Sequence, residues 1–465
     1  MTPASVAAAG RGVARAFLAC AALSLLVGLA GGLVVGLHYT ALSPTLSRMG
    51  LGLAALRPIH TGATAGWIFF AGMAVVHRWL FERLEARVAE GDATALPLVN
   101  AVARRARLQL GLWVFAALSA AAALLAGYST GREYLEYPPV CSIPIVAGWL
   151  LYAWNFVAVT RYRIRNMPVY AWMWGTSVVL FLWTFAEANA WMLDVLRERP
   201  VRDMAIQWKA YGSLVGSFNL LVYGSTSWLG TRISDDKYAR SNMAFALFLV
   251  GVLNSFTNYV HHTYHLPQAE LPKWIAFFVS MLEAVILARV MYDVAGLGRK
   301  WADRKRHPVV QTLLIATTTW TFVQLTFAIL ISIPPLNTWI HGTLAVVAHS
   351  MGSLIGIDSM ALLAAGTWLM EEGDEARPLD VGAARRGLWS AGALNTGLAG
   401  MWLVLAIVGV QAGIGLVLRG ELPWVGAFPA WTGPGIVGAG LLAALGMVGL
   451  VLPWLTRRAA TVLAP

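Results

Sequence analysis

Four histidines in this sequence lie near the ends of three apolar stretches, where a polar ring is unexpected. His261 and His262 close one stretch. His349 lies about two helical turns into another stretch, and His60 about one turn into a third. An ionisable side chain inside lipid is costly, so it is by default a functional-site hypothesis. Because neutral imidazole is a common ligand of haem iron, copper and non-haem iron, the four rings predict a buried haem and metal centre.

The spacing of His349 and Met351 allows each side chain to serve a different haem. Residues two apart on a helix lie about 200° apart around its axis, so these two point to opposite sides. A methionine thioether as an axial ligand raises the reduction potential of a haem relative to two histidines. Methionine also fills gaps in apolar cores, and this alternative stays open for Met351. For the histidines, the alternatives are hydrogen bonds to backbone carbonyls or the lining of an outer vestibule.

The composition indicates that membrane helices position these residues. Of the 465 residues, 58% are hydrophobic and only 12% are charged, which is far from the balance of a soluble domain. A helix needs about 20 apolar residues to cross a bilayer core of about 30 Å. The sequence therefore predicts one all-α, polytopic membrane domain over residues 1–465. Its twelve transmembrane helices are expected at 15–40, 55–80, 107–127, 143–161, 168–190, 205–229, 241–262, 273–295, 310–333, 342–369, 388–417 and 432–456.

The distribution of basic residues predicts the orientation of the chain. If both termini are cytoplasmic, most of the 34 lysines and arginines fall in inner segments, as the positive-inside rule requires. Only His77 and His307 of the nine histidines then lie on the inner side. The net charge of +11 thus reflects topology and contact with the lipid bilayer, and no nucleic-acid partner is expected.

The cysteines argue against covalently attached haem and against a disulfide framework. Cys20 and Cys141 are the only two, and neither belongs to a CxxCH motif or a metal-site spacing. Any haem held by this chain is therefore expected to be non-covalent.

Several segments together carry a resemblance to a known family. They are His60-Thr61, the run Gly-Arg-Glu-Tyr-Leu-Glu at 131–136, His261-His262, Leu282-Glu283, the run Pro-Leu-Asn-Thr-Trp-Ile-His-Gly-Thr at 335–343, and Ala348-His349. With these segments, the chain resembles the large catalytic subunit of bacterial cytochrome c-dependent nitric oxide reductase, within the haem-copper oxidase superfamily. The resemblance covers most of the chain and includes the same number of membrane spans.

The resemblance implies a role for each matching residue. His60 would be an axial ligand of a low-spin haem b, and His349 the proximal ligand of a high-spin haem b. His261 and His262 would hold a non-haem iron, or copper, facing that second haem. Glu133 falls where the family binds a calcium ion.

Two carboxylates have a further implied role. Glu136 and Glu283 fall at family positions linked to proton delivery and to the two-metal site. A solvated loop charge is the alternative for Glu133 and Glu136. Glu283 is harder to explain in that way, because a carboxylate inside an apolar helix is costly.

The resemblance also implies partners and a location. The electron donor would be a membrane-anchored cytochrome c subunit, since this chain has no CxxCH of its own. The substrate would be a small gas, NO or O2. The protein would lie in the bacterial inner (cytoplasmic) membrane, with the metal site toward the periplasmic side.

The sequence departs from the family at three ligand positions. Met351 stands where the family has the second histidine of the low-spin haem. Gly212 and Gly216 fall where the sixth helix of the family supplies a third histidine and a glutamate to the non-haem metal. His265 is one replacement, because a continued helix would bring it near His261. The other polar residues nearby are Tyr211, Asn219, Asn258 and Tyr264.

These departures leave several functions open. The first is reduction of NO to N2O, and the second is a divergent activity such as NO dismutation or O2 reduction. A third is a haem subunit that transfers electrons or senses a gas without catalysis. Twelve spans also suit a secondary transporter, although transporters place their polar groups near the membrane midplane rather than toward one face.

Overall fold

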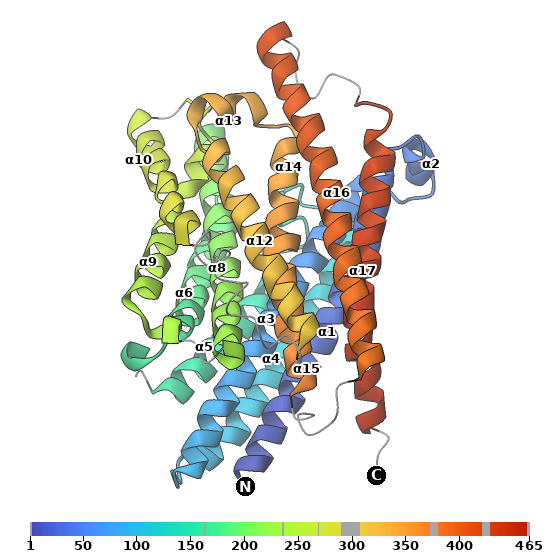
Figure 1. Ribbon diagram of the computed structural model, residues 1–465. Helices are drawn as coiled ribbons and strands as arrows, with labels where there is room; N and C mark the ends of the chain where they lie inside the picture. Colours follow the sequence, from blue (N-terminus) through green and yellow to red (C-terminus); the bar gives the residue numbers. More distant parts are fainter. Residues whose placement is uncertain are drawn as a thin grey trace.

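The computed structural model is built from long helices that run side by side (Figure 1). It describes residues 2–161, 164–234, 237–267, 269–289, 307–372, 380–420 and 428–462. The longer helices are α1 (Pro3–Leu37), α3 (Leu53–Ala89), α4 (Ala95–Leu125), α5 (Ser142–Thr160), α6 (Val169–Asn189), α8 (Pro200–Ser234), α9 (Asn242–Thr257), α10 (Glu270–Met281), α12 (Pro308–Ile331), α14 (Leu344–Met351), α15 (Met360–Glu371), α16 (Val381–Arg419) and α17 (Thr432–Val462). Short helices are α2 (Ser43–Arg48), α7 (Asp194–Arg197) and α13 (Pro334–Ile340). The described residues contain no strand, which confirms the all-α fold class.

Eleven helical segments of the described chain are long and apolar enough to cross a membrane. The twelfth expected span, 205–229, lies inside α8, which is long enough at 35 residues but less apolar. Glycines and serines at 212–217 lower its apolar character. These small residues let α8 pack closely against its neighbours, as membrane helices commonly do. The last six residues of the expected span 273–295 lie outside the described residues.

Glycines bring α16 and α17 into direct backbone contact. A Cβ atom on Gly397 would lie 2.3 Å from the backbone nitrogen of Ala443, and one on Gly446 would lie 2.4 Å from that of Leu394. No side chain fits at such distances. The glycine-rich composition of the last two spans is therefore explained by close helix packing.

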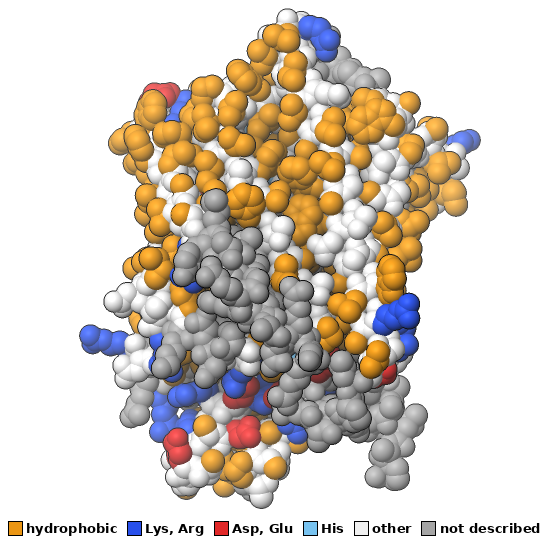
Figure 2. Space-filling model, viewed as in Figure 1, with side chains coloured by type: hydrophobic (Ala, Val, Ile, Leu, Met, Phe, Trp, Pro, Cys, Tyr) orange, Lys and Arg blue, Asp and Glu red, His pale blue; other side chains and the backbone are white. Residues whose placement is uncertain are grey.

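Charged side chains gather at the end of the molecule where both termini lie (Figures 1 and 2). Arg78 on α3 is 5% exposed, and its Nε donates to Glu372 at 2.8 Å, directly after α15. Arg232 at the end of α8 pairs with Glu82 of α3. Ion pairs thus join three helices at this end. The hydrophobic surface extends over the middle and the opposite end (Figure 2).

Two expected spans are not continuous α-helices, and both carry candidate ligands. After α9, the chain tightens into a 3-10 turn over Asn258–His262 and leaves helical geometry at Thr263. The span expected at 342–369 consists of α14, an eight-residue π-helix (Gly352–Ser359) and α15. The hydroxyl of Ser359 donates to the carbonyl of Leu354 at 2.7 Å, a five-residue reach that matches the π-helical period.

Candidate haem and metal centre

His60 is held in the geometry of a metal-ligating histidine. Its Nδ1 lies 2.7 Å from the carbonyl oxygen of Gly28 on α1. A carbonyl can only accept, so Nδ1 carries the proton and Nε2 is left free to bind a metal. A Cβ atom on Gly32 would lie 2.7 Å from Cε1 of the same ring. Helix α1 therefore leaves a space that the His60 ring fills.

His261 and His262 direct their Nε2 atoms to one point. The two atoms are 3.1 Å apart. Two nitrogens bound to one ion at about 2.05 Å and separated by this distance subtend an angle of about 98°. The indole ring of Trp208 stacks on His262 with centroids 4.9 Å apart and planes 6° from parallel. His261 Nδ1 is buried without a hydrogen-bond partner among the described residues. The pair fits two ligands of one metal ion.

His349 completes the cluster from α14. Its ring lies within electrostatic range of both His261 and His262, and so does His341, at the end of α13. The ring of Phe327 on α12 packs against His349 with centroids 6.1 Å apart. Three of the four sequence-predicted histidines thus lie within electrostatic range of one another, two from the 3-10 turn at Asn258–His262 and one from α14.

Met351 and His60 are not in direct contact. Among the described residues, no hydrogen bond or ring contact joins the two. Met351 is half-buried and packs against the apolar core. Its role as a haem ligand stays a prediction.

His265 follows the 3-10 turn that carries His261 and His262, after the chain leaves helical geometry at Thr263. Its ring packs against His341 with centroids 4.3 Å apart. Partial desolvation lowers the pKa of His265 and also that of His341. Within the described ranges, no three histidine, cysteine, aspartate or glutamate side chains are grouped to hold a metal. His265 as a third metal ligand stays a prediction.

The structure gives a physical reason for the glycine at position 216. A Cβ atom there would lie 2.5 Å from the hydroxyl oxygen of Ser255 on α9. The hydroxyl of Ser213 donates to the Ser255 carbonyl at 2.6 Å, which fixes the same close approach. A glutamate at position 216 would need α8 and α9 to separate.

Glu283 is half-buried, and one of its two carboxylate oxygens has no hydrogen-bond partner among the described residues. The amide of Asn254 on α9 donates to its Oε1. Its Oε2 is buried with no partner among the described residues. Tyr223 of α8 lies within electrostatic range of Glu283 and of Asp358 in the π-helix.

Asp358 and Gln324 are two buried polar residues that the sequence reasoning did not single out. Each is 2% exposed. Asp358 has no hydrogen bond to any residue that the structure describes. The argument that marked Glu283, a carboxyl inside an apolar stretch, applies equally to Asp358 and would have found it. Gln324 carries no such signal, because a neutral amide is common in helices.

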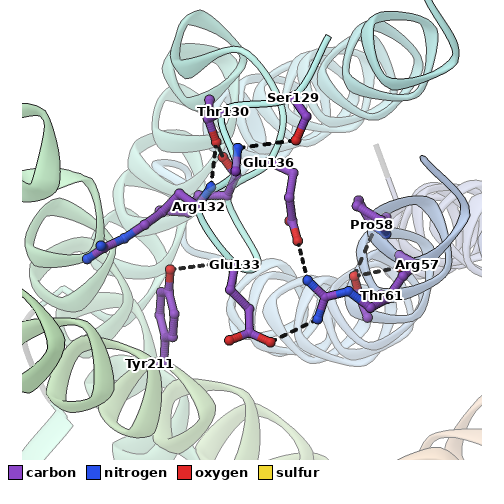
Figure 3. Close-up of polar contacts among 11 residues, drawn as sticks. Arg57, Pro58, Thr61, Ser129, Thr130, Arg132, Glu133, Glu136 and Tyr211 are labelled. Atoms are coloured by element: carbon purple, nitrogen blue, oxygen red, sulfur yellow. Dashed lines mark hydrogen bonds and ion pairs between the residues drawn. The ribbon is translucent and has the colours of Figure 1, made fainter. Parts of the chain in front are cut away.

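The two carboxylates Glu133 and Glu136, in the loop between α4 and α5, share one arginine (Figure 3). Arg57 donates to Glu133 at 2.8 Å and to Glu136 at 2.9 Å. The Tyr211 hydroxyl donates to the backbone carbonyl of Glu133. Burial raises the pKa of Glu136, whose side chain is 8% exposed, although Arg57 opposes the shift. The loop is thereby tied to α3 one turn before His60 and to α8.

This arrangement does not fit a calcium ion held by this chain alone. Calcium takes six to eight oxygen ligands, whereas each of these carboxylates binds a guanidinium nitrogen. A calcium ion at Glu133 would have to displace Arg57 and recruit oxygens from elsewhere. The calcium site stays a prediction from the resemblance.

The fold and the site together define an integral membrane protein with a histidine-lined interior centre. The sequence profile of the family described as cytochrome c and quinol oxidase polypeptide I matches residues 12–419. The chain therefore belongs to this family, the subunit I family of the haem-copper oxidases. It is accordingly a membrane subunit for respiratory electron transfer and reduction of a gas, in a family that binds haems and a metal centre.

A solved structure supports the fold. The chain is similar to a haem-copper terminal oxidase dimer determined by cryo-electron microscopy, with a TM-score of 0.65 and 16% sequence identity. The match covers 98% of this chain and 84% of that one. No curated protein matches the sequence.

Proposed function

We propose that this chain is the catalytic subunit of an enzyme of the nitric oxide reductase type. His60 and Met351 would hold a low-spin haem b, His349 a high-spin haem b, and His261 with His262 a non-haem iron or copper ion. These groups would supply electron transfer from a membrane-anchored cytochrome c subunit. Two NO molecules, two electrons and two protons would then give N2O and water. The convergence of the His261 and His262 Nε2 atoms beside His349 carries the proposal.

The chain's own residues would position the metal ligands and supply protons. Stacking on Trp208 fixes the plane of the His262 ring. Glu283 would hold a proton at Oε2, the oxygen that Asn254 leaves unpartnered. Arg57 would keep the outer loop closed over the His60 end of α3.

A second candidate is reduction of O2 at the same centre. It is favoured by the contact between Gly216 and Ser255, which excludes the carboxylate that the nitric oxide reductase resemblance requires. The similar solved structure is also named as a terminal oxidase. Both candidates use the same histidines, so only turnover distinguishes them.

The test is anaerobic NO consumption and separate O2 consumption by purified, metal-analysed protein. The proposal expects two b haems and one iron or copper per chain, with NO consumed and N2O formed. Oxygen consumption alone would favour the second candidate. Full haem loading with neither gas consumed would identify an electron-transfer or sensor subunit.

Two variants test the metal site directly. His262→Ala should lose the non-haem metal and retain haem, because His262 supplies one of the two converging nitrogens. His265→Ala is the matched control and should keep the metal, because that ring packs on His341 instead. Equal metal loss in both variants, or none in either, would remove the metal assignment.

A further inference from the structure

The buried side-chain amide of Gln324 connects His349 of α14 to Trp402 of α16. Gln324 lies on α12, and its amide sits between His349 of α14 and Trp402 of α16. Helix α14 packs against α16, and α12 borders both (Figure 1). Nothing in the sequence placed these residues together, since they come from three separate spans.

Trp402 determines which way the amide faces. The indole nitrogen can only donate, so the amide oxygen faces it and accepts at 3.0 Å. The amide nitrogen then faces His349, where it donates to the backbone carbonyl at 3.1 Å and to Nδ1 at 3.2 Å. The opposite orientation would set oxygen against oxygen and nitrogen against nitrogen. Three contacts therefore favour a single orientation.

Gly352 reserves the space that this amide occupies. With the amide in this orientation, a Cβ atom on Gly352 would lie 1.8 Å from the amide oxygen that faces Trp402 and 2.4 Å from its carbonyl carbon, Cδ. Gly352 is the first residue of the π-helix, so the amide lies where α14 gives way to it. Any larger residue would push the amide away from His349.

His349 and His60 are consequently held in opposite ways. The Nδ1 atom of His60 donates to a carbonyl, which leaves Nε2 free for iron. The Nδ1 atom of His349 instead accepts from an amide, which leaves the proton on Nε2. Iron binding through Nε2 needs that proton to move to Nδ1, and the Gln324 amide then has to rotate against Trp402.

We propose that Gln324, locked by Trp402, is a positioning residue that sets the tautomer of His349 and weakens this histidine as an axial ligand. The inference rests on the proposed haem at His349 and concerns residues that do not touch the haem iron. Iron binding at His349 has to overcome this tautomer and rotate the amide, whereas the carbonyl at His60 already holds the tautomer that iron needs. His60 would thus be a strong axial ligand and His349 a weak one, because of the groups that contact their Nδ1 atoms.

The test replaces the donor with an acceptor and reads the iron–histidine bond. In Gln324→Glu, a carboxylate accepts from Nδ1–H, so the iron–histidine stretching frequency of the reduced high-spin haem should rise. The midpoint potential of that haem should fall, while the low-spin haem bands stay unchanged. Trp402→Phe removes only the indole N–H that fixes the Gln324 amide, so it should shift the iron–histidine stretching frequency in the same direction by a smaller amount. It also provides a second readout if the glutamate variant assembles poorly.

The matched control uses a parallel pair on the same two helices. Trp320 of α12 donates its indole N–H to Asn395 of α16 at 3.3 Å, and neither residue contacts His349. Asn395→Asp makes the same amide-to-carboxylate change and should leave the stretching frequency unshifted. An unshifted frequency in Gln324→Glu, or an equal shift in Asn395→Asp, overturns the inference. Wild-type protein without a high-spin haem removes the proposed function, and this inference with it.

Discussion

The space around His60 allows a quantitative prediction for Gly32→Ala. The added Cβ atom would lie 2.7 Å from Cε1 and 2.9 Å from Nδ1 of the ring, so the ring must move by several tenths of an ångström. This movement breaks the 2.7 Å bond from Nδ1 to the Gly28 carbonyl, which is worth about 1 kcal/mol. Overpacking adds about 1–3 kcal/mol. The sum is about 2–4 kcal/mol against the bound geometry of His60, or a roughly 30- to 700-fold loss in low-spin haem affinity.

The assay is the low-spin haem spectrum and the haem content of purified protein. Gly12→Ala is the matched control, because Gly12 lies on the same helix and a Cβ atom there meets nothing within 4 Å. Both substitutions gain the same helix propensity, about 1 kcal/mol, so their difference isolates the ring contact. A Gly32→Ala protein with wild-type low-spin bands would refute the assignment of His60 as a ligand held by α1.

Three further predictions concern stability, measured as thermal unfolding in detergent. Gly216→Ala should destabilise by about 1–3 kcal/mol through overpacking against Ser255, and the double variant with Ser255→Gly should recover most of the loss; no recovery would contradict the contact. Burial raises the pKa of Glu136 above its unfolded value, so the folded state binds the proton more tightly and stability falls as pH rises through this window. Glu136→Gln should therefore show a flatter pH profile of stability than wild type as the pH rises above about 4.5, and an identical slope would refute this assignment. Asp358→Asn should raise the melting temperature, because it replaces a buried carboxyl that has no hydrogen bond among the described residues; a lower melting temperature would show that the carboxyl is stabilised in place.

Composition and span length were sufficient to predict the fold class. Each apolar run was long enough to be recognised, and structure and family confirm the helical membrane architecture. The expected span 205–229 lies within α8, but α8 is less apolar than the other spans because its small residues pack against neighbouring helices.

The relations between spans could not be read in the same way. The sequence showed that Gly216 replaces a family carboxylate, but the reason lies in Ser255, on a different helix. The expectation that His265 would approach His261 assumed a continued helix, whereas the chain leaves helical geometry at Thr263. Gln324 and Trp402 meet through tertiary packing alone. Finer activity within the family depends on such contacts, which a single sequence does not display.

The π-helical segment separates the registers of the two halves of one span. An α-helix advances about 100° per residue and the wider π-helix advances less, so deleting one residue between Gly352 and Ser359 would let this segment return to α-geometry and change which of its residues face the neighbouring helices. Asp358 would then turn away from Tyr223, while His349 kept its place. The α14 half of this span can thus keep His349 in place while the segment after it changes which face it presents. An insertion or deletion of a single residue here is a route by which related chains could gain or lose the interior carboxyl without altering the metal centre.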